Sequence, residues 1–178
     1  MFHLTIFSGT EGELAPTGTT VLTFFGGAEL RRPTLAQQLV HYRASRGRAR
    51  SRWDWLLGSQ ENIVVTIFGG TTVREPTLAE EHAALAAAVR SGQIDRRELP
   101  GLLDELEAHA GAKGALRTLT FFGACVVTAW KASKERKALD AAAETGAITA
   151  AARRVLETLV EAPRSVRWRA LGELALTA

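Results

Sequence analysis

A string of six residues recurs four times in this chain with little change, and this repetition limits the possible folds more than any other feature. The four copies share a threonine followed by two apolar residues and a small corner: LTIFSG from Leu4, LTFFGG from Leu22, VTIFGG from Val65 and LTFFGA from Leu119. Successive threonines of these copies are 18, 43 and 54 residues apart. β-Branched and aromatic residues before a glycine predict short strands that turn at the glycine.

The offsets between the copies extend beyond the six residues. The segments GGAELRRPTLAQQ from Gly26 and GGTTVREPTLAEE from Gly69 share an arginine and the string PTLA at the offset of 43. Two helix-like segments, which begin at Ala84 and Ala138, align at the offset of 54. Because one offset aligns both a strand motif and a helical segment, we expect a duplicated unit of strands and helices.

Each full unit is predicted to run strand, glycine corner, strand, helix, glycine, helix. Residues suited to cap the N-termini of these helices stand at matching places: Thr34, Thr77, Asp95 and Thr149. Gly92 and Gly146 follow the first helices of the last two units. We expect both glycines to have positive φ and to end these helices.

The sequence therefore predicts an α+β fold, a small parallel β-solenoid-like stack of strands with helical pairs inserted between the units and covering one face. The single domain would contain units over about 1–18, 19–61, 62–115 and 116–162, and a C-terminal helix over 163–178. In-register parallel stacking places identical residues above one another, so we expect the four motif phenylalanines to share one core. The alternative is an antiparallel sheet in which each glycine pair makes a hairpin turn.

The strand segments with their glycine corners resemble the C-terminal domain of LiaF-type proteins, which are bacterial cell-wall-active antibiotic response proteins. The segments AAAVRSGQIDRRELPGLLDELE and DAAAETGAITAAARRVLETL are similar to SHOCT-like helical modules. The resemblance implies a β-solenoid-like domain and a role in envelope-stress signalling. LiaF-type proteins usually carry transmembrane helices, which this sequence does not show, and the family offers no catalytic residues to transfer.

Composition places the chain among ordinary folded proteins. Hydrophobic residues make up 46% of the 178 residues and charged residues 23%, which argues against a disordered chain. The net charge of +3 is too small to argue for nucleic acid by itself. The first residues lack the basic and apolar regions of a signal peptide, and no apolar run is long enough to span a bilayer. We expect a cytoplasmic protein.

The chain shows no arrangement of residues that predicts a reaction. The four histidines have no second ligand at metal-binding spacing, and His82 beside Glu80 and Glu81 is expected to be exposed. The single cysteine, Cys125, lies in an apolar strand and is expected to be an inert buried thiol. Glycines before a helix faintly resemble a phosphate loop, but the lysine of such a loop is absent. We expect no catalytic activity, no cofactor and no metal.

The segment HYRASRGRARSRWDW concentrates the positive charge and is the main candidate for binding. Its arginines and tryptophans form the predicted partner-binding set: Arg43, Arg46, Arg48, Arg50, Arg52, Trp53 and Trp55. Guanidinium groups pair with carboxylates and phosphates, and aromatic rings stack on bases. An acidic protein, nucleic acid and an anionic membrane surface are the alternative partners, and a solvated loop anchored by its tryptophans is the non-functional interpretation.

The C-terminal segment RSVRWRALGELALTA predicts a last helix packed on the core. Its expected apolar face comprises Val166, Ala170, Leu171 and Leu174, with Trp168 to the side. Two functions remain: a non-enzymatic interaction or regulatory scaffold with a protein partner, and a nucleic-acid-binding module that uses the arginine cluster. Because an exposed sheet edge invites strand pairing, a homodimer is also compatible with the sequence.

Overall fold

The computed structural model describes residues 2–5, 10–14, 20–45, 62–110, 116–128 and 131–177. The chain divides into two compact units whose segments alternate along the sequence. The strand unit comprises Met1–Pro33, Ala44–Glu75 and His109–Ala129. The helical unit comprises Thr34–Arg43, Pro76–Ala108 and Trp130–Ala178. Within the described residues the fold is therefore α+β, with the strands in one unit and the helices in the other.

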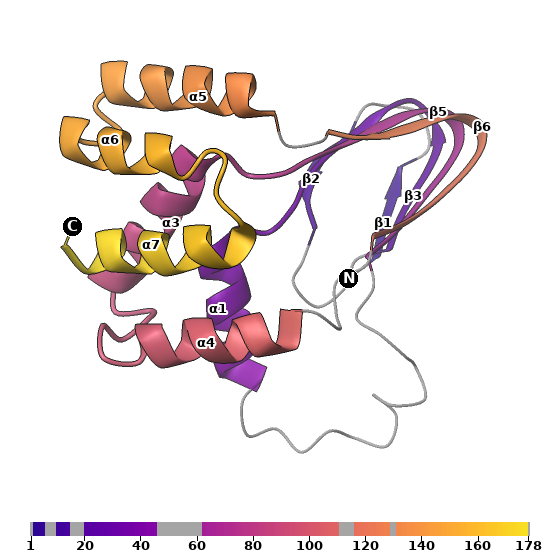
Figure 1. The fold of residues 1–178 in the computed structure, drawn as a ribbon. Helices are drawn as coiled ribbons and strands as arrows, with labels where there is room; N and C mark the ends of the chain where they lie inside the picture. Colours follow the sequence, from indigo (N-terminus) through magenta and orange to yellow (C-terminus); the bar gives the residue numbers. More distant parts are fainter. Residues whose placement is uncertain are drawn as a thin grey trace. The chain divides into compact units, whose positions relative to one another are not determined.

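Six strands form one sheet in the strand unit (Figure 1). They are β1 (Phe2–Thr5), β2 (Thr10–Glu13), β3 (Thr20–Phe25), β4 (Ala28–Arg31), β5 (Asn62–Arg74) and β6 (Leu116–Val127). The sheet order is β1-β3-β5-β4-β2, and the long strand β6 pairs with β5. Every described pair of strands is parallel, so the antiparallel hairpin alternative is wrong.

The register of the sheet places like residues opposite one another. Thr5 pairs with Thr23, Thr23 with Thr66, and Thr66 with Thr120. The three registers therefore equal the sequence offsets of 18, 43 and 54 residues that separate the motif threonines. Parallel pairing at these offsets explains why strand residues recur in the sequence at the same positions.

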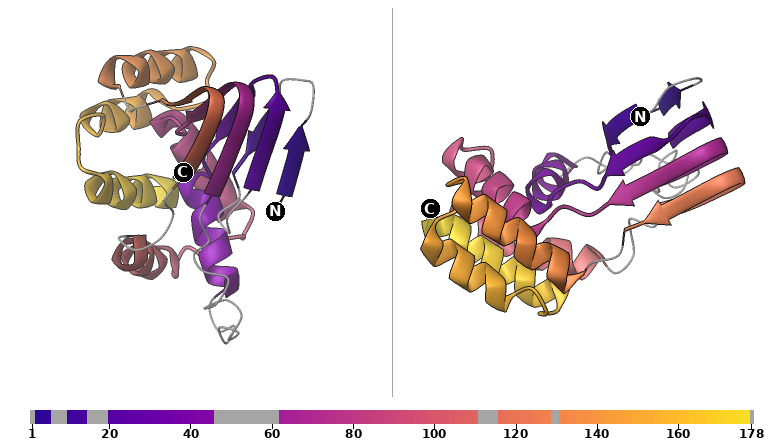
Figure 2. Two further views of the ribbon diagram at one scale, coloured as in Figure 1. Left: turned by 90° about the vertical axis from the view of Figure 1, so that its right-hand side faces the viewer. Right: turned by 90° about the horizontal axis from the view of Figure 1, so that it is seen from above.

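The long strands β5 and β6 curl along their length, as the left view of Figure 2 shows. Gly26 and Gly69 have φ of 129° and 132°, a region that side chains with a Cβ rarely adopt. A Cβ on Gly69 would overlap the carbonyl oxygen of Gly26, and a Cβ on Gly123 would overlap that of Gly69. The corners of neighbouring strands approach so closely that only glycine fits there.

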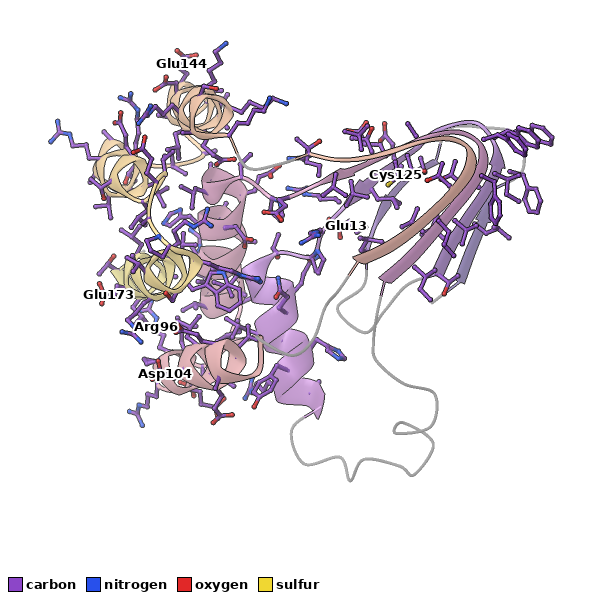
Figure 3. All side chains as sticks on the ribbon, turned by 45° about the vertical axis from the view of Figure 1, so that its right-hand side comes forward. Glu13, Arg96, Asp104, Cys125, Glu144 and Glu173 are labelled. Carbon is purple, nitrogen blue, oxygen red and sulfur yellow. The ribbon has the colours of Figure 1, made fainter. Side chains whose placement is uncertain are left out.

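Aliphatic side chains of leucine, valine and alanine fill the core of the strand unit. Its apolar cluster consists of Leu14, Val21, Ala28, Leu30, Val64 and Val73, and Cys125 packs against it half-buried (Figure 3). The motif threonines Thr23 and Thr66 are fully buried beside these residues, and the Thr66 hydroxyl lies 2.5 Å from that of Thr71.

The expectation that the motif phenylalanines share this core is wrong. Phe25, Phe68 and Phe122 are 47%, 42% and 69% exposed, while Phe7 lies outside the described residues. In-register pairing determines which side chains are neighbours, but it does not determine whether their column faces the core. The interior of this small sheet is already occupied by valine and threonine.

Six helices are described in the helical unit. They are α1 (Leu35–Ser45), α3 (Leu78–Arg90), α4 (Leu99–Ala110), α5 (Ala132–Glu144), α6 (Ala150–Thr158) and α7 (Arg164–Thr177). Predicted caps are confirmed at three of them, where side-chain oxygens of Thr34, Thr77 and Thr149 accept backbone N–H groups of the first turn. Before α4, Asp95 instead caps a turn by accepting from the Arg97 N–H, and the helix begins at Leu99.

The predicted glycine ends of two helices are confirmed. Gly92 and Gly146 have φ of 75° and 73° and follow α3 and α5. Their neighbours Ile94 and Ile148 are buried, as the alignment at the offset of 54 predicts for residues after the glycine. The helices α3 and α5 therefore each end at a glycine in the left-handed conformation, and the chain then continues to α4 and α6 respectively.

Two helices are capped at their N-termini by a carboxylate from another helix: α1 by a glutamate of α3, and α3 by a glutamate of α5. Glu81 of α3 accepts from the Leu35 N–H at 2.6 Å, and Glu135 of α5 accepts from the Leu78 N–H at 3.0 Å. Leu35 and Leu78 are 43 residues apart and the two glutamates 54, which are the offsets of the strands. The negative charge stabilises the positive end of each helix dipole.

The apolar face of α7 differs from the predicted one. The buried residues are Trp168, Leu171, Gly172 and Ala175, and the helix contacts α3. These positions follow the i, i+3, i+4, i+7 pattern of one helix face. Val166 is exposed instead. Of the other predicted residues, Leu171 is buried and Ala170 and Leu174 are half-buried, so the prediction was wrong about Val166 and about placing Trp168 to the side.

Candidate interaction surface

An exposed column of stacked phenylalanines crosses three strands of the sheet. The ring centroids of Phe25 and Phe68 are 5.1 Å apart at an interplanar angle of 2°, and those of Phe68 and Phe122 are 5.1 Å apart at 8°. The column follows from register, since Phe25 pairs with Phe68 and Phe68 with Phe122. Because all three side chains are exposed, the column presents a continuous apolar surface to solvent.

The last strand enlarges this apolar surface. Five large apolar residues of β6 are exposed: Leu119, Phe121, Phe122, Val126 and Val127. Among the described strands, β6 pairs with β5 alone. The contrast with β5 is large, because Val73 is 0% exposed whereas its register partner Val127 is 44% exposed. Successive side chains of a strand point to opposite faces, so these β6 residues lie on both faces of the strand. We define them together with the phenylalanine column as the apolar strand surface.

The described part of the chain contains one residue of the predicted arginine and tryptophan set. Only Arg43 of that set is described, and it is tied to the helical unit. Its Nε lies 3.0 Å from Oε2 of Glu98, and its Nη1 donates to the carbonyl of Gln93 at 2.8 Å. The other predicted residues, Arg46, Arg48, Arg50, Arg52, Trp53 and Trp55, lie outside the described residues. Arg43 itself is engaged in an ion pair and a hydrogen bond within its own unit.

His82 is buried in α3, so its expected exposure on an early helical turn is wrong. Among the described residues, neither ring nitrogen has a hydrogen-bond partner. Burial lowers the pKa of His82 below its usual value of 6.5, and the nearby positive charge of Arg90 lowers it further. Within the described residues no group of three histidine, cysteine or carboxylate side chains is placed to bind a metal ion.

Sequence reasoning missed the apolar strand surface because it assigned the phenylalanines to the core. One signal was available, since Phe121 and Phe122 are successive apolar residues of β6. A strand that covers a core on one face alone alternates between apolar and polar side chains. Consecutive apolar residues in an edge strand therefore indicate a second apolar face.

Comparisons with protein-family models, with curated proteins and with solved structures find no match to this chain. Of the helices in the described segments, none combines the length and the apolar character needed to cross a bilayer. The described residues therefore form a curled parallel sheet with an exposed apolar surface and a separate helical unit.

Proposed function

We propose that this protein is a non-enzymatic interaction scaffold, in which a β-solenoid-like stack of repeated units presents the apolar strand surface to a protein partner. The observation that carries the proposal is the exposure of three stacked phenylalanines in successive strands. Contiguous exposed apolar patches are rare on monomeric proteins and mark interaction sites. Aromatic residues are enriched at the cores of protein interfaces.

The rigidity of the surface supports a binding role. Backbone pairing of β3, β5 and β6 fixes the spacing of the phenylalanine column, and the glycine corners fix the curl of its strands. A surface that is already ordered loses little conformational entropy when a partner binds. The proposed scaffold therefore presents its apolar contacts in the geometry in which they are used.

The resemblance of the strand and helix motifs to LiaF-type and SHOCT-like sequences gives the proposal a biological setting. We place the partner in regulatory signalling of the bacterial envelope-stress response. The proposal draws on the quoted motifs, and its partner is a protein whose contact region is apolar. Partner capture from the native host tests this setting directly.

The experiment is a pulldown with the tagged full-length chain from its native host. Phe68→Ser and Phe122→Ser each replace one ring of the column with a polar side chain. The matched control is Val166→Ser, which changes an exposed apolar residue of α7 in the helical unit. We expect a defined partner that the two phenylalanine variants lose and that the control retains. Equal recovery of this partner by all three variants would refute the proposed surface.

A further inference from the structure

The free edge of β6 has the properties of a strand that lacks its neighbour. The internal strand β5 pairs with β3 and β4 along one edge and with β6 along the other. Among the described strands, β6 has a partner along one edge only. Its residues are also more exposed than the β5 residues with which they pair, as Phe68 and Phe122 at 42% and 69% show. One further strand would reproduce at β6 the environment of β5.

The register specifies how such a strand would pair. The junctions of β1 with β3, β3 with β5 and β5 with β6 are parallel and place threonine opposite threonine. Parallel pairing leaves the outer edge of β6 with the same pattern of N–H and C=O groups that β5 offers to β6. Edge strands with such free groups act as templates for an added strand. An added strand in this register places its own threonine opposite Thr120.

The glycine corner adds a second requirement. At the two described junctions, a Cβ at the corner of the later strand would overlap the carbonyl oxygen of the earlier corner glycine. The same geometry at Gly123 demands a glycine in the added strand. It also demands a residue that stacks on Phe122 immediately before this glycine, since Phe25, Phe68 and Phe122 each precede a corner glycine.

A second copy of this chain does not meet these requirements through its own free strand. In a second copy the strand at the other end of the sheet is β1, which is described from Phe2 to Thr5. By sequence alone, the position 18 residues before Gly26 is occupied by a serine, Ser8. Serine carries a Cβ where the corner geometry requires glycine. The edge of β6 therefore selects for a strand from a different protein.

We propose that the free edge of β6 binds an extended segment of a partner protein by parallel strand addition. The segment carries Thr, one apolar residue, Phe and Gly in succession, aligned with Thr120 to Gly123. This inference rests on the proposed function and names the class of partner that the apolar strand surface takes. Main-chain hydrogen bonds provide the affinity, and the phenylalanine stack and the glycine corner provide the specificity.

The test uses the full-length protein and three fluorescent peptides. The first peptide has the sequence of residues 63–74, IVVTIFGGTTVR, which contains the required Thr, Phe and Gly. The second and third peptides carry Gly69→Ala and Gly70→Ala and have identical compositions. In β5 a Cβ on Gly69 overlaps a backbone oxygen, whereas a Cβ on Gly70 lies 3.8 Å from the nearest one. We expect the first and third peptides to bind and the second to bind about tenfold more weakly or not at all, because a Cβ is costly at positive φ.

A protein variant locates the binding edge. Val126→Lys places a charge on the exposed part of β6 and should weaken binding of the first peptide, while Val166→Ser on α7 should not. Equal binding of the two alanine peptides, or unchanged binding to Val126→Lys, would overturn the inference.

Sedimentation of the chain alone gives a further check, because a β6-dependent dimer that excludes the peptide would assign the edge to a second copy. Loss of the native partner in the phenylalanine variants without any peptide binding would refute strand addition and leave the scaffold proposal intact.

Discussion

Gly123 and Gly70 show how strongly the effect of a single methyl group depends on the neighbouring strand. Both lie at the corners of long strands, but a Cβ overlaps a carbonyl oxygen only at Gly123. We expect Gly123→Ala to lower the free energy of unfolding by about 1–3 kcal/mol, as overpacking does in protein interiors. Gly70→Ala should change it by less than about 0.5 kcal/mol, because the added methyl meets only ordinary contacts. Urea denaturation followed by circular dichroism measures both, and equal losses would contradict the close approach of the corners.

His82 should make stability depend on pH. Burial lowers its pKa in the folded state below 6.5, so the unfolded chain binds more protons between the two pKa values. The stabilising effect of the neutral imidazole is therefore complete above about pH 6.5, the pKa of an unperturbed histidine. It is lost as the pH falls from this value through the folded pKa. Thermal melts from pH 7.5 to 5 should show this loss in the wild type and in a His41→Gln control.

The variant His82→Leu separates this histidine from the carboxylates that also titrate in acid. It removes the buried proton-binding site and should flatten the decline in melting temperature just below pH 6.5. A decline of the same size in His82→Leu and in the wild type would show that His82 does not cause the dependence.

At the scale of elements, α1, α3 and α5 are linked by carboxylates: α3 caps the N-terminus of α1, and α5 caps that of α3. Glu135 is buried and accepts from the Leu78 N–H, so Glu135→Gln weakens a charge-assisted hydrogen bond at the start of α3. We expect this variant to lose about 1–2 kcal/mol of unfolding free energy. Glu161→Gln is the control, because Glu161 pairs with Arg136 on the surface, where an ion pair contributes less than about 1 kcal/mol. Equal effects of the two substitutions in urea denaturation would contradict the capping role.

The elements show which features the sequence could predict. The offsets predicted the parallel register, because pairing acts between identical positions of successive strands. The threonine caps and Gly92 and Gly146 were predictable for a different reason, since they depend on local backbone geometry. The faces of elements were harder to predict. The phenylalanines and Val166 are exposed while other apolar residues, many of them leucines, are buried, so hydrophobicity alone does not show which face is buried.

The candidate site was less predictable than the fold. The arginine and tryptophan set was chosen for local charge density, yet Arg43 is bound to Glu98 and Gln93 at the end of α1. The apolar strand surface depends on long-range pairing that brings Phe25, Phe68 and Phe122 together. The consecutive apolar residues Phe121 and Phe122 indicate a second apolar face of β6, but the column itself follows only from the register that the offsets predict.

At the scale of the whole molecule, the remaining arginines provide a test of the two classes of partner. Their positions, Arg46, Arg48 and Arg50, lie outside the described residues. The triple variant to serine should keep the melting temperature of the wild type, because the sequence predicts a solvated loop for these residues and substitutions in such loops change stability little. We expect it to lose any salt-sensitive binding to nucleic acid or anionic vesicles, because phosphate contacts depend steeply on salt. Unchanged binding by the variant in low salt would show that these arginines do not make the anion contacts.

The central claim is that like residues of successive strands lie side by side in a parallel sheet. Oxidative cross-linking tests it in a Cys125→Ser background, where Phe68→Cys with Phe122→Cys introduces a pair on adjacent strands. Adjacent strands of a sheet lie about 4.8 Å apart, a separation that a disulfide can bridge. Residues on strands that are separated by a third strand lie about 10 Å apart, which is too far for a disulfide. We predict rapid formation of an intramolecular disulfide in this pair, measured by mass spectrometry of non-reduced peptides, and none with Phe25→Cys and Phe122→Cys. A Phe68→Cys and Phe122→Cys pair that stays reduced, or equal bridging of both pairs, would contradict the in-register parallel sheet.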